Sequence, residues 1–589
     1  METKYNIPQW LENRYSLLWE AFKNSEFRME DAVKVLEEKN KDNEDAVAVF
    51  ISELRKLGWI NVKFDPHDAR KRLYRLKSKE EIVREILEFN KNHLSRSEIE
   101  GILKKAADLI RTRVDYKFIL ILLFLKRISD KWELEYEKAY KEALEDGLSE
   151  EEAKKEAKNS IYHDFDLPEE FLWDNIRKDV KNLPEKFSQA LKKLAEKNPE
   201  LKDVLDNVSF LQFTTSRENT EILRQLVELF SEKKLTHVSP DVLGDAYEWI
   251  LRYFAPQKAK EGEVYTPREV IQLIVEILDP KPGQSVYDPA SGSNGMLIIS
   301  YNYVEEKYGK QEAEKLFLYG QEANLTTLGL GKMNLYIHDI RNAQVVYGDT
   351  LLYPKFKEDE NIRKFDIVLA NPPWNQDGYD ETVLKKGEFW SKRFKEFPPR
   401  NSADWAWAQH MIASAKYKVG LVIDNGCLFR GGKERSIRTK ILKKDLIDCV
   451  ILLPEKLFYN TGAPGAIIIF NKKKPEERKN KVLFINASKE YEQHPDVRKL
   501  NRLGDEHIKK IVKAYNDFKD IEGFSRVVSF EEIKENDFNL NVTLYVFPME
   551  EIEEIDIGKE WRELRNIEKE IEEVEKKIEG YLKEVNITW

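Results

Sequence analysis

The sequence predicts an α/β protein with a mostly parallel sheet, preceded and followed in the chain by helical regions. Between about residues 260 and 485, short apolar runs alternate with segments of helical periodicity, which is typical of parallel strands joined by helices. Polar signatures follow several of these runs directly, and ligands of such sheets bind at the carboxyl ends of the strands. The candidate strands are QSVYDPA, LFLYGQE, AQVVYGD, FDIVLAN, KVGLVID, DCVILLP, AIIIFN and VLFINA.

Length and composition limit the class of protein. The 589 residues suggest about three or four domains, and 41% hydrophobic content supports real cores. A net charge of −10 gives no overall signature of a nucleic-acid binder, so a DNA partner would require a local basic surface or another subunit. The two cysteines, Cys427 and Cys449, lie in apolar runs and predict reduced, buried thiols without zinc spacing. Without a signal-peptide pattern or an apolar run of membrane-spanning length, we expect a cytoplasmic protein that contacts no membrane.

Four regions are predicted along the chain. Residues 1–80 form a winged-helix-like extension, because two amphipathic segments, the second ending at Gly58, precede an alternating hairpin pattern. Its basic hairpin residues would contact DNA or a partner, and a small packing module with a solvated hairpin is an equally good interpretation. Residues 81–255 are helical around the apolar stretch YKFILILLFLKRISDKWE, 256–500 are the α/β domain, and 501–589 are a helical tail. The hairpin residues are Arg70, Lys71, Arg72 and Arg75.

The tail carries a regular apolar seam. Its members are spaced alternately three and four residues apart, the pattern of a coiled coil in a highly charged helix. The sequence therefore predicts that this helix pairs with another helix, either in a partner or in the same chain. The seam consists of Leu564, Ile567, Ile571, Val574, Ile578, Tyr581 and Val585.

Three signatures at strand ends favour a nucleotide-type ligand. Asp288 is followed by the loop Gly292–Gly295, where glycines permit close approach and the next helix exposes free N–H groups. Glu322 ends the next run and could accept both hydroxyls of a ribose. Asp349 ends another and could accept a hydrogen bond from an adenine amino group. Dinucleotide enzymes share such signatures, and each one alone could be an ordinary strand cap.

The run FDIVLA ends in Asn371, Pro372, Pro373 and Trp374. Two prolines stop the strand and make a rigid turn. The Asn371 carbonyl and a backbone carbonyl would then be two fixed acceptors for the N–H groups of an exocyclic amine, leaving its nitrogen lone pair free to attack. Trp374 would stack on the base, which must leave the duplex to reach the pocket.

With these motifs, the chain resembles amino-group DNA methyltransferases that use S-adenosylmethionine, and in detail the modification subunit of type I restriction-modification systems. GEVYTPREVIQLIVEIL resembles the family segment that closes over the methionine part of the cofactor. DWAWAQHMIASAKYKVGLVIDNGCLFRGGKERSIRTKIL resembles its Gln-His helix and NG-x-LF-x-GG loop, and EKLFYNTGAPGAIIIFNKKK its closing strand pair. RTRVDYKFILILLFLKRISD resembles its helical N-terminal domain, so that the resemblance covers roughly residues 95–500.

The resemblance implies a Rossmann-like S-adenosylmethionine-dependent methyltransferase domain whose site holds no metal. Ser293 and Asn294 depart from the family loop, which usually carries more glycine or alanine, and Trp374 is bulkier than the Phe often found there. The implied catalytic residues are Asn371, Pro372, Pro373 and Trp374. The implied cofactor-binding residues are Glu263, Val264, Tyr265, Thr266, Pro267, Arg268, Asp288, Gly292, Ser293, Asn294, Gly295, Glu322 and Asp349.

The implied reaction is one in-line transfer of a methyl group to adenine N6, which the motif order favours over cytosine N4. The substrate is double-stranded DNA with a flipped adenine. Only about 100 residues follow the catalytic domain, too few for a target-recognition domain, so a separate specificity subunit would choose the site. The resemblance also implies two methylase subunits per specificity subunit and a restriction subunit. The alternatives are a self-sufficient adenine methyltransferase, a cofactor-binding scaffold of a DNA-bound complex, and an enzyme acting on a small molecule or a peptide glutamine.

Overall fold

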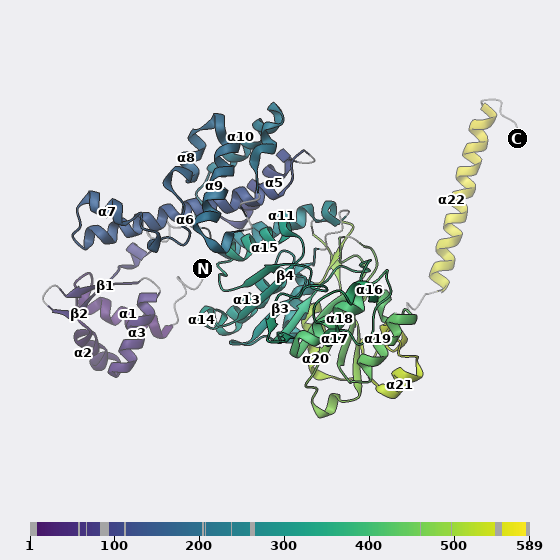
Figure 1. Ribbon diagram of the computed structural model, residues 1–589. Helices are drawn as coiled ribbons and strands as arrows, with labels where there is room; N and C mark the ends of the chain where they lie inside the picture. The colour runs from purple at the N-terminus through teal and green to yellow at the C-terminus, as the bar shows by residue number, and fades with distance from the viewer. Residues whose placement is uncertain are drawn as a thin grey trace. The chain divides into compact units, whose positions relative to one another are not determined.

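The computed structural model describes two compact units, which are shown with their elements in Figure 1. Unit 1 comprises Met1–Glu261, Ser291–Asn294 and Glu322–Tyr347, and unit 2 comprises Gly262–Ala290, Gly295–Gln321 and Gly348–Trp589. The described residues are 9–56, 59–65, 68–82, 94–110, 113–202, 205, 208–236, 238, 240–259, 265–459, 461–495, 497–547 and 557–584.

The first elements of unit 1 are helices followed by a hairpin, the order that the sequence predicts. The helices are α1 (Gln9–Phe22), α2 (Met29–Asn40) and α3 (Glu44–Lys56), and the hairpin joins β1 (Ile60–Asp65) and β2 (Asp68–Leu76). A core of their own buries Leu18, Phe50 and Leu54 completely. Of the basic hairpin residues, Arg72 is exposed and Arg75 lies 3.5 Å from Glu81. Gly58 and the side chains of Arg70 and Lys71 lie outside the described residues, and the role of this extension stays a prediction.

The rest of unit 1 is mostly helical. The apolar stretch predicted to be its centre begins α6 (Lys117–Glu145), whose residues 118–126 are all buried. Segment 322–347 also belongs to this unit, with α15 (Leu325–Ile337) and β5 (Gln344–Tyr347). Tyr336 of α15 contacts Phe124, and Arg341 pairs with Asp164 at 2.6 Å. The other main helices are α5 (Arg96–Ile110), α7 (Glu150–Glu156), α8 (Trp173–Lys178), α9 (Leu183–Lys197), α10 (Arg217–Ser231) and α11 (Pro240–Ala259).

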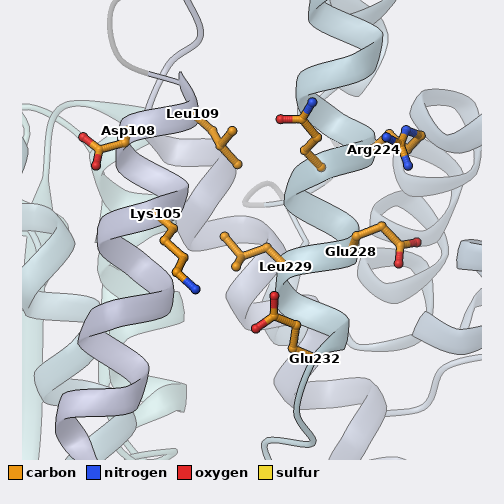
Figure 2. Close-up of a pocket in the computed structure, with 8 residues that line it drawn as sticks. Lys105, Asp108, Leu109, Arg224, Glu228, Leu229 and Glu232 are labelled. Carbon is orange, nitrogen blue, oxygen red and sulfur yellow. The ribbon is translucent and has the colours of Figure 1, made fainter.

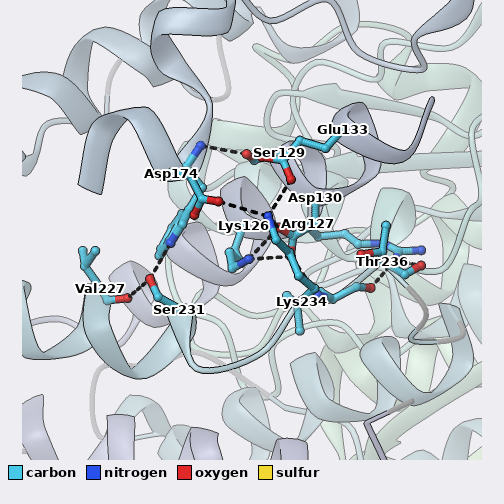
Figure 3. A network of polar contacts seen from close by, with 12 residues as sticks. Lys126, Arg127, Ser129, Asp130, Glu133, Asp174, Val227, Ser231, Lys234 and Thr236 are labelled. Atoms are coloured by element: carbon cyan, nitrogen blue, oxygen red, sulfur yellow. Dashed lines mark hydrogen bonds and ion pairs between the residues drawn. The ribbon is translucent and has the colours of Figure 1, made fainter. Parts of the chain in front are cut away.

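A buried polar network ties α6 to its neighbours (Figure 3). Nζ of Lys126 lies 2.5 and 2.6 Å from the two carboxylate oxygens of Asp130, and both side chains are excluded from solvent. The Asp130 carboxylate also accepts a hydrogen bond from the N–H of Leu235, while Ser129 accepts one from the N–H of Trp173. Because buried charges require such partners, this network fixes how the helices of unit 1 pack.

Unit 2 contains the predicted sheet. Its strands lie in the order β15-β12-β10-β11-β9-β8-β3-β4, with β4, β3, β8 and β9 mutually parallel and β11 antiparallel to both neighbours. Every apolar run that predicted a strand contains one, and the predicted α/β fold with a mostly parallel sheet is confirmed. The strands are β3 (Ser285–Asp288), β4 (Phe317–Glu322), β8 (Phe365–Ala370), β9 (Ala415–Asp424), β10 (Ile447–Leu452), β11 (Gly465–Asn471), β12 (Lys481–Asn486) and β15 (Ser525–Ser529).

Helices pack on this sheet at close range. On β9, a Cβ at Gly420 would lie 2.6 Å from Ile274 of α12 (Arg268–Leu278), so glycine allows the helix to approach the strand. None of the helices in the described ranges is long and apolar enough to cross a bilayer. The other main helices of the unit are α13 (Gly295–Tyr308), α18 (Asp404–Ser414), α19 (Gly432–Leu442), α20 (Asp505–Asp517) and α21 (Phe530–Glu535).

The region predicted as a helical tail, 501–589, differs from that prediction in its first half. β15 pairs with β12 and extends the sheet, and Ile511 of α20 and Ile533 of α21 are fully buried. The short run SRVVS gives little periodic signal, and its pairing depends on a strand about 40 residues earlier. The predicted seam lies on α22 (Ile557–Glu584), where Leu564, Ile567, Ile571, Val574 and Ile578 are each about half exposed, while Val585 and the side chain of Tyr581 lie outside the described residues.

Candidate functional site

In the polar loop after β8, hydrogen bonds fix both the nitrogen and the oxygen of one side-chain amide. Asn371, only 7% exposed, donates from Nδ2 to Oγ1 of Thr266 at 2.9 Å. Its Oδ1 accepts a hydrogen bond of 2.9 Å from the indole N–H of Trp374. Since an amide oxygen has two lone pairs, Oδ1 keeps one for a ligand. The amide is therefore an oriented acceptor at the carboxyl end of a parallel strand.

Aromatic rings surround this loop. The rings of Trp374 and Phe458 meet edge to face, with centroids 4.7 Å apart. Gly465, the first residue of β11, lies beside both, and a Cβ there would be 2.7 Å from Phe458 and 2.8 Å from Trp374. Tyr265 and Tyr459 form a second edge-to-face pair at 5.7 Å. The sequence analysis included the stretch that contains Phe458 but assigned no role to its ring. The position of this phenylalanine shortly before β11, a strand that begins with glycine, is the signal that could have indicated a role.

A polar network supports the residue after the tryptophan. Asn375 has a left-handed backbone, with φ of 52°, and its N–H donates to Oδ2 of Asp404 at 2.9 Å. Its side-chain oxygen accepts a hydrogen bond of 2.6 Å from Arg430, which also pairs with Asp424. These contacts hold the exit of the NPPW loop in one conformation, and the sequence analysis missed them.

Asp404 also belongs to a buried cluster with Cys427 and Glu434, whose potential ligand atoms lie within 4.8 Å of one another. The Ser402 hydroxyl lies within hydrogen-bond distance of both carboxyl groups, at 2.8 Å from Asp404 and 2.5 Å from Glu434. Burial raises the pKa of both carboxyl groups and that of the Cys427 thiol, which favours neutral groups. Arg430 lies 3.6 Å from Glu434 and already supplies a positive charge. The cluster therefore acts as a support for the loop, and its donors fit a metal ion poorly.

Two further predicted residues, Asp288 and Asp349, belong to unit 2. Asp288, at the end of β3, is buried and accepts a hydrogen bond from the N–H of Ala290. Asp349 is half-buried and accepts from the N–H of Leu352 at 3.0 Å and from the hydroxyl of Tyr379 at 2.8 Å. Burial and this carboxylate raise the pKa of Tyr379, which therefore stays a donor. The Asp349 carboxylate is thus fixed in place with lone pairs left for a ligand.

The remaining predicted residues of unit 2 surround the start of two helices. Pro267 caps α12 and Arg268 is its exposed first residue, while Gly295 begins α13 with a Cβ position 3.1 Å from Ile271. Pro372 is buried and Pro373 half-buried beside Asn371. Glu263 and Val264 lie outside the described residues.

In unit 1 the glycine loop and the predicted ribose acid are in direct contact. The Glu322 carboxylate accepts hydrogen bonds from the N–H of Gly292 at 2.9 Å and of Asn324 at 2.8 Å. The carbonyl of Ser293 accepts one from the side chain of Asn334. Asn294 is fully buried in a left-handed conformation, and neither its Nδ2 nor its Oδ1 has a partner among the described residues. A buried orphan amide beside an anchored carboxylate fits a polar ligand with hydroxyl groups.

A cavity of about 520 Å³ between α5 and α10 of unit 1 has no comparable chemistry (Figure 2). Two of its charged residues, Arg224 and Glu228, are paired with Glu221 and Arg177. The cavity is a gap between two helices, in which these two charges are already neutralised.

The chain matches known proteins over nearly its whole length. The family model of N-6 DNA methylases matches residues 238–554, and that of the HsdM N-terminal domain matches residues 99–230. The MjaVII methylase subunit, a type I restriction enzyme subunit of Methanocaldococcus jannaschii, is 46% identical over 98% of each chain. The HindI methylase subunit of Haemophilus influenzae is 32% identical over 61% of this chain and 82% of its own. The crystal structure of the type I restriction-modification methyltransferase subunit from Streptococcus thermophilus is 27% identical, with a TM-score of 0.66 over 77% of this chain and 100% of that one.

The family match over residues 238–554 places this α/β sheet, which follows a helical N-terminal region, in the class of N-6 DNA methylases. Within this class, the chain belongs to the family of type I restriction enzyme methylase subunits. The family resemblance predicted from the sequence is therefore confirmed.

Proposed function

We propose that the chain transfers the methyl group of S-adenosylmethionine to adenine N6 in DNA, at sites chosen by a separate specificity subunit. The observation that carries this proposal is the Asn371 amide, held by Thr266 and Trp374 with its oxygen available as an acceptor. A base amine is the substrate group that such an acceptor suits.

Within each unit by itself, polar residues that follow the strands fit groups of the cofactor. When bound, S-adenosylmethionine supplies a methyl group already activated on a sulfonium. Glu322 would bind its ribose hydroxyls with the lone pairs not used by Gly292 and Asn324. Asp349 would accept from its adenine amino group, and the orphan amide of Asn294 would gain a polar partner. These residues bind and orient the donor, and desolvation with alignment lowers the barrier to transfer.

The NPPW loop would hold the acceptor nitrogen. Oδ1 of Asn371 and the backbone carbonyl of Pro372 accept the two N–H groups of the adenine amine, which keeps its lone pair available for attack. The base must leave the duplex to reach this point, and the half-buried ring of Trp374, which packs against Phe458, offers apolar surface for it. N6 of adenine is favoured over N4 of cytosine because the chain belongs to the N-6 DNA methylase family.

The α22 seam supports the part of the proposal that concerns partners. Five apolar side chains stand about half exposed along one stripe of a charged helix, a surface that a second helix would cover. We assign this stripe to the specificity subunit, in a complex of two methylase subunits with one specificity subunit, to which a restriction subunit can add. A self-sufficient methyltransferase remains the second candidate, since the hairpin of residues 60–76 exposes Arg72.

The test is transfer of a labelled methyl group to mixed-sequence duplex DNA. The chain is assayed alone, with a co-expressed specificity partner, and as Asn371→Ala with that partner; Asn516→Ala, an exposed asparagine on α20, is the control. We expect activity only with the partner, lost in Asn371→Ala while cofactor binding persists. Activity from the chain alone would establish the self-sufficient enzyme. Cofactor binding without transfer in every mixture would establish a scaffold.

A further inference from the structure

A second concave surface of unit 2 adjoins the NPPW loop. It is a cavity of about 890 Å³, here called the basic cavity, formed by the loop after β10 and by the hairpin of β13 (Glu492–Gln493) and β14 (Asn501–Arg502). Phe458 lines it and also contacts the ring of Trp374. The cavity therefore begins where the proposed base site ends.

Its cations are free to bind an anion. Lys456, Arg498 and Lys499 line the cavity and are exposed, and within the described ranges no carboxylate forms an ion pair with any of them. No acidic residue occurs among the described lining residues. In the hairpin itself, Glu492 is neutralised by Arg502 at 2.7 Å. In a chain with a net charge of −10, this is a local concentration of positive charge.

The backbone that carries these cations is fixed. The side chain of Asn501 donates to the carbonyl of Glu455 at 2.9 Å, and its N–H donates to the carbonyl of Lys456 at 2.9 Å. Gln493 donates to the carbonyl of Arg498 at 3.2 Å and closes the hairpin. The two walls are thus joined by hydrogen bonds, which holds the cations at set positions relative to Phe458.

Aromatic and amide side chains complete the lining. The ring of Tyr491 is 47% exposed, and Tyr459 and Gln493 also line the cavity. An exposed ring such as that of Tyr491, next to cations without an ion pair, is a combination with which proteins follow a nucleic-acid strand, because rings stack on bases and cations contact phosphates. Neutral or positively charged ligands would leave the three cations without partners.

We propose that the basic cavity binds the sugar-phosphate backbone of the DNA strand that carries the target base, on the nucleotides next to that base. This inference rests on the proposed function for its choice of ligand. Contacts to phosphate fix the strand without reading sequence, so the cavity positions the base for the NPPW loop while a separate subunit selects the site.

The test uses the complex of the full chain with its specificity partner and a duplex that contains the recognised site. Variants are Arg498→Gln with Lys499→Gln, and Lys456→Gln. The matched control is Lys513→Gln with Lys519→Gln, two exposed lysines on and after α20. We expect the slope of log affinity against log salt to fall by about 0.9 for each phosphate that the variant no longer binds, uniformly across DNA sequences. The KM for DNA should rise, while cofactor affinity stays unchanged.

The outcomes separate this inference from the proposed function. A wild-type complex that methylates DNA, with salt slopes equal in wild type, variants and control, would overturn the basic cavity alone. Slopes reduced in the variants, in a complex that binds DNA without transferring methyl groups, would support the cavity and overturn the proposed function. An equal reduction in the control variant would mean that the effect is one of overall charge, which also overturns the cavity. Unchanged thermal unfolding shows that the variants are folded.

Discussion

The indole N–H of Trp374 donates a hydrogen bond of 2.9 Å to Oδ1 of Asn371, three residues earlier in the same loop. Thr266 accepts from the other end of that amide. If the amide flipped, its NH2 group would face the indole N–H, and two donors would be opposed. A tryptophan after the two prolines therefore does what a phenylalanine cannot, because it fixes which end of the amide faces the substrate.

Replacing Trp374 with Phe tests this orientation. The ring and its contact with Phe458 persist, while one neutral hydrogen bond is removed, worth about 0.5–1.5 kcal/mol. We expect kcat to fall about two- to tenfold, with little change in the KM for DNA, in single-turnover methyl transfer. Trp374→Ala should lose more, because it also removes the apolar surface. A full rate in Trp374→Phe would show that the indole N–H has no orienting role.

Thr266→Val removes the other anchor at nearly constant volume. Nδ2 of a buried amide then lacks its acceptor, at a cost of about 1–3 kcal/mol, and the amide gains freedom to turn. We expect a larger loss of kcat than in Trp374→Phe, about five- to a hundredfold. Thr266→Ser keeps the hydroxyl and should retain most of the activity. Full activity in Thr266→Val together with a loss in Thr266→Ser would instead point to the methyl group of the threonine.

Gly465→Ala tests the packing of the two rings. The added methyl group would lie 2.7 Å from Phe458 and 2.8 Å from Trp374, so one ring must move, at about 1–3 kcal/mol. We expect lower kcat with little change in cofactor affinity. Adding Phe458→Leu to this variant makes room for the methyl group and should recover part of the lost kcat. A double-mutant cycle of the two substitutions measures this recovery. Gly101→Ala, where nothing lies within 4 Å, is the control and should leave activity unchanged.

The sequence was informative wherever a feature is local. Glu322 and Asn371 end apolar runs, and an acid or amide after a buried strand is visible in a few consecutive residues. The exposed seam of α22 was visible for the same reason, because one helix carries the whole pattern.

The sequence did not predict the contacts that join distant segments of the chain. Thr266 and Asn371 are 105 residues apart, and Trp374 and Phe458 meet only after β11 has paired with its neighbours. Periodicity likewise shows which face of a segment is apolar without showing what covers it. That is why α15, read as part of the α/β domain, packs within unit 1, and why β15 was read as part of a helical tail.

The seam of α22 predicts a specific loss of assembly. Ile571→Asp places a charge in the middle of the stripe, which a facing helix would have to bury unpaired. We expect the specificity subunit to stop co-purifying with this variant, while cofactor affinity is unchanged. Glu572→Asp, next to it on the charged face, should co-purify normally. Normal co-purification of both variants would exclude the seam as the docking surface.

Glu135 of α6 predicts a pH dependence in the stability of unit 1. Burial raises the pKa of its carboxyl group to about 7, although Asp164 donates a backbone hydrogen bond to it at 3.1 Å. His163 lies 3.6 Å away, and because burial lowers the pKa of its imidazole it supplies little positive charge near neutrality. Lys131 lies 3.9 Å away and also pairs with Asp164, so that its charge only partly opposes the effect of burial. The folded chain therefore holds a proton that the unfolded chain releases above about pH 4.5.

It follows that this contribution to stability is present at pH 4.5 and is lost as the pH rises to about 7. Glu135→Gln resembles the protonated acid at every pH. Its unfolding free energy relative to the wild type should therefore increase between pH 4.5 and pH 7 and level off above, as measured by denaturant unfolding across that range. Glu142→Gln, exposed on the same helix, should show a constant difference. A difference for Glu135→Gln that shrinks with rising pH would mean that the folded state stabilises the ionised carboxylate.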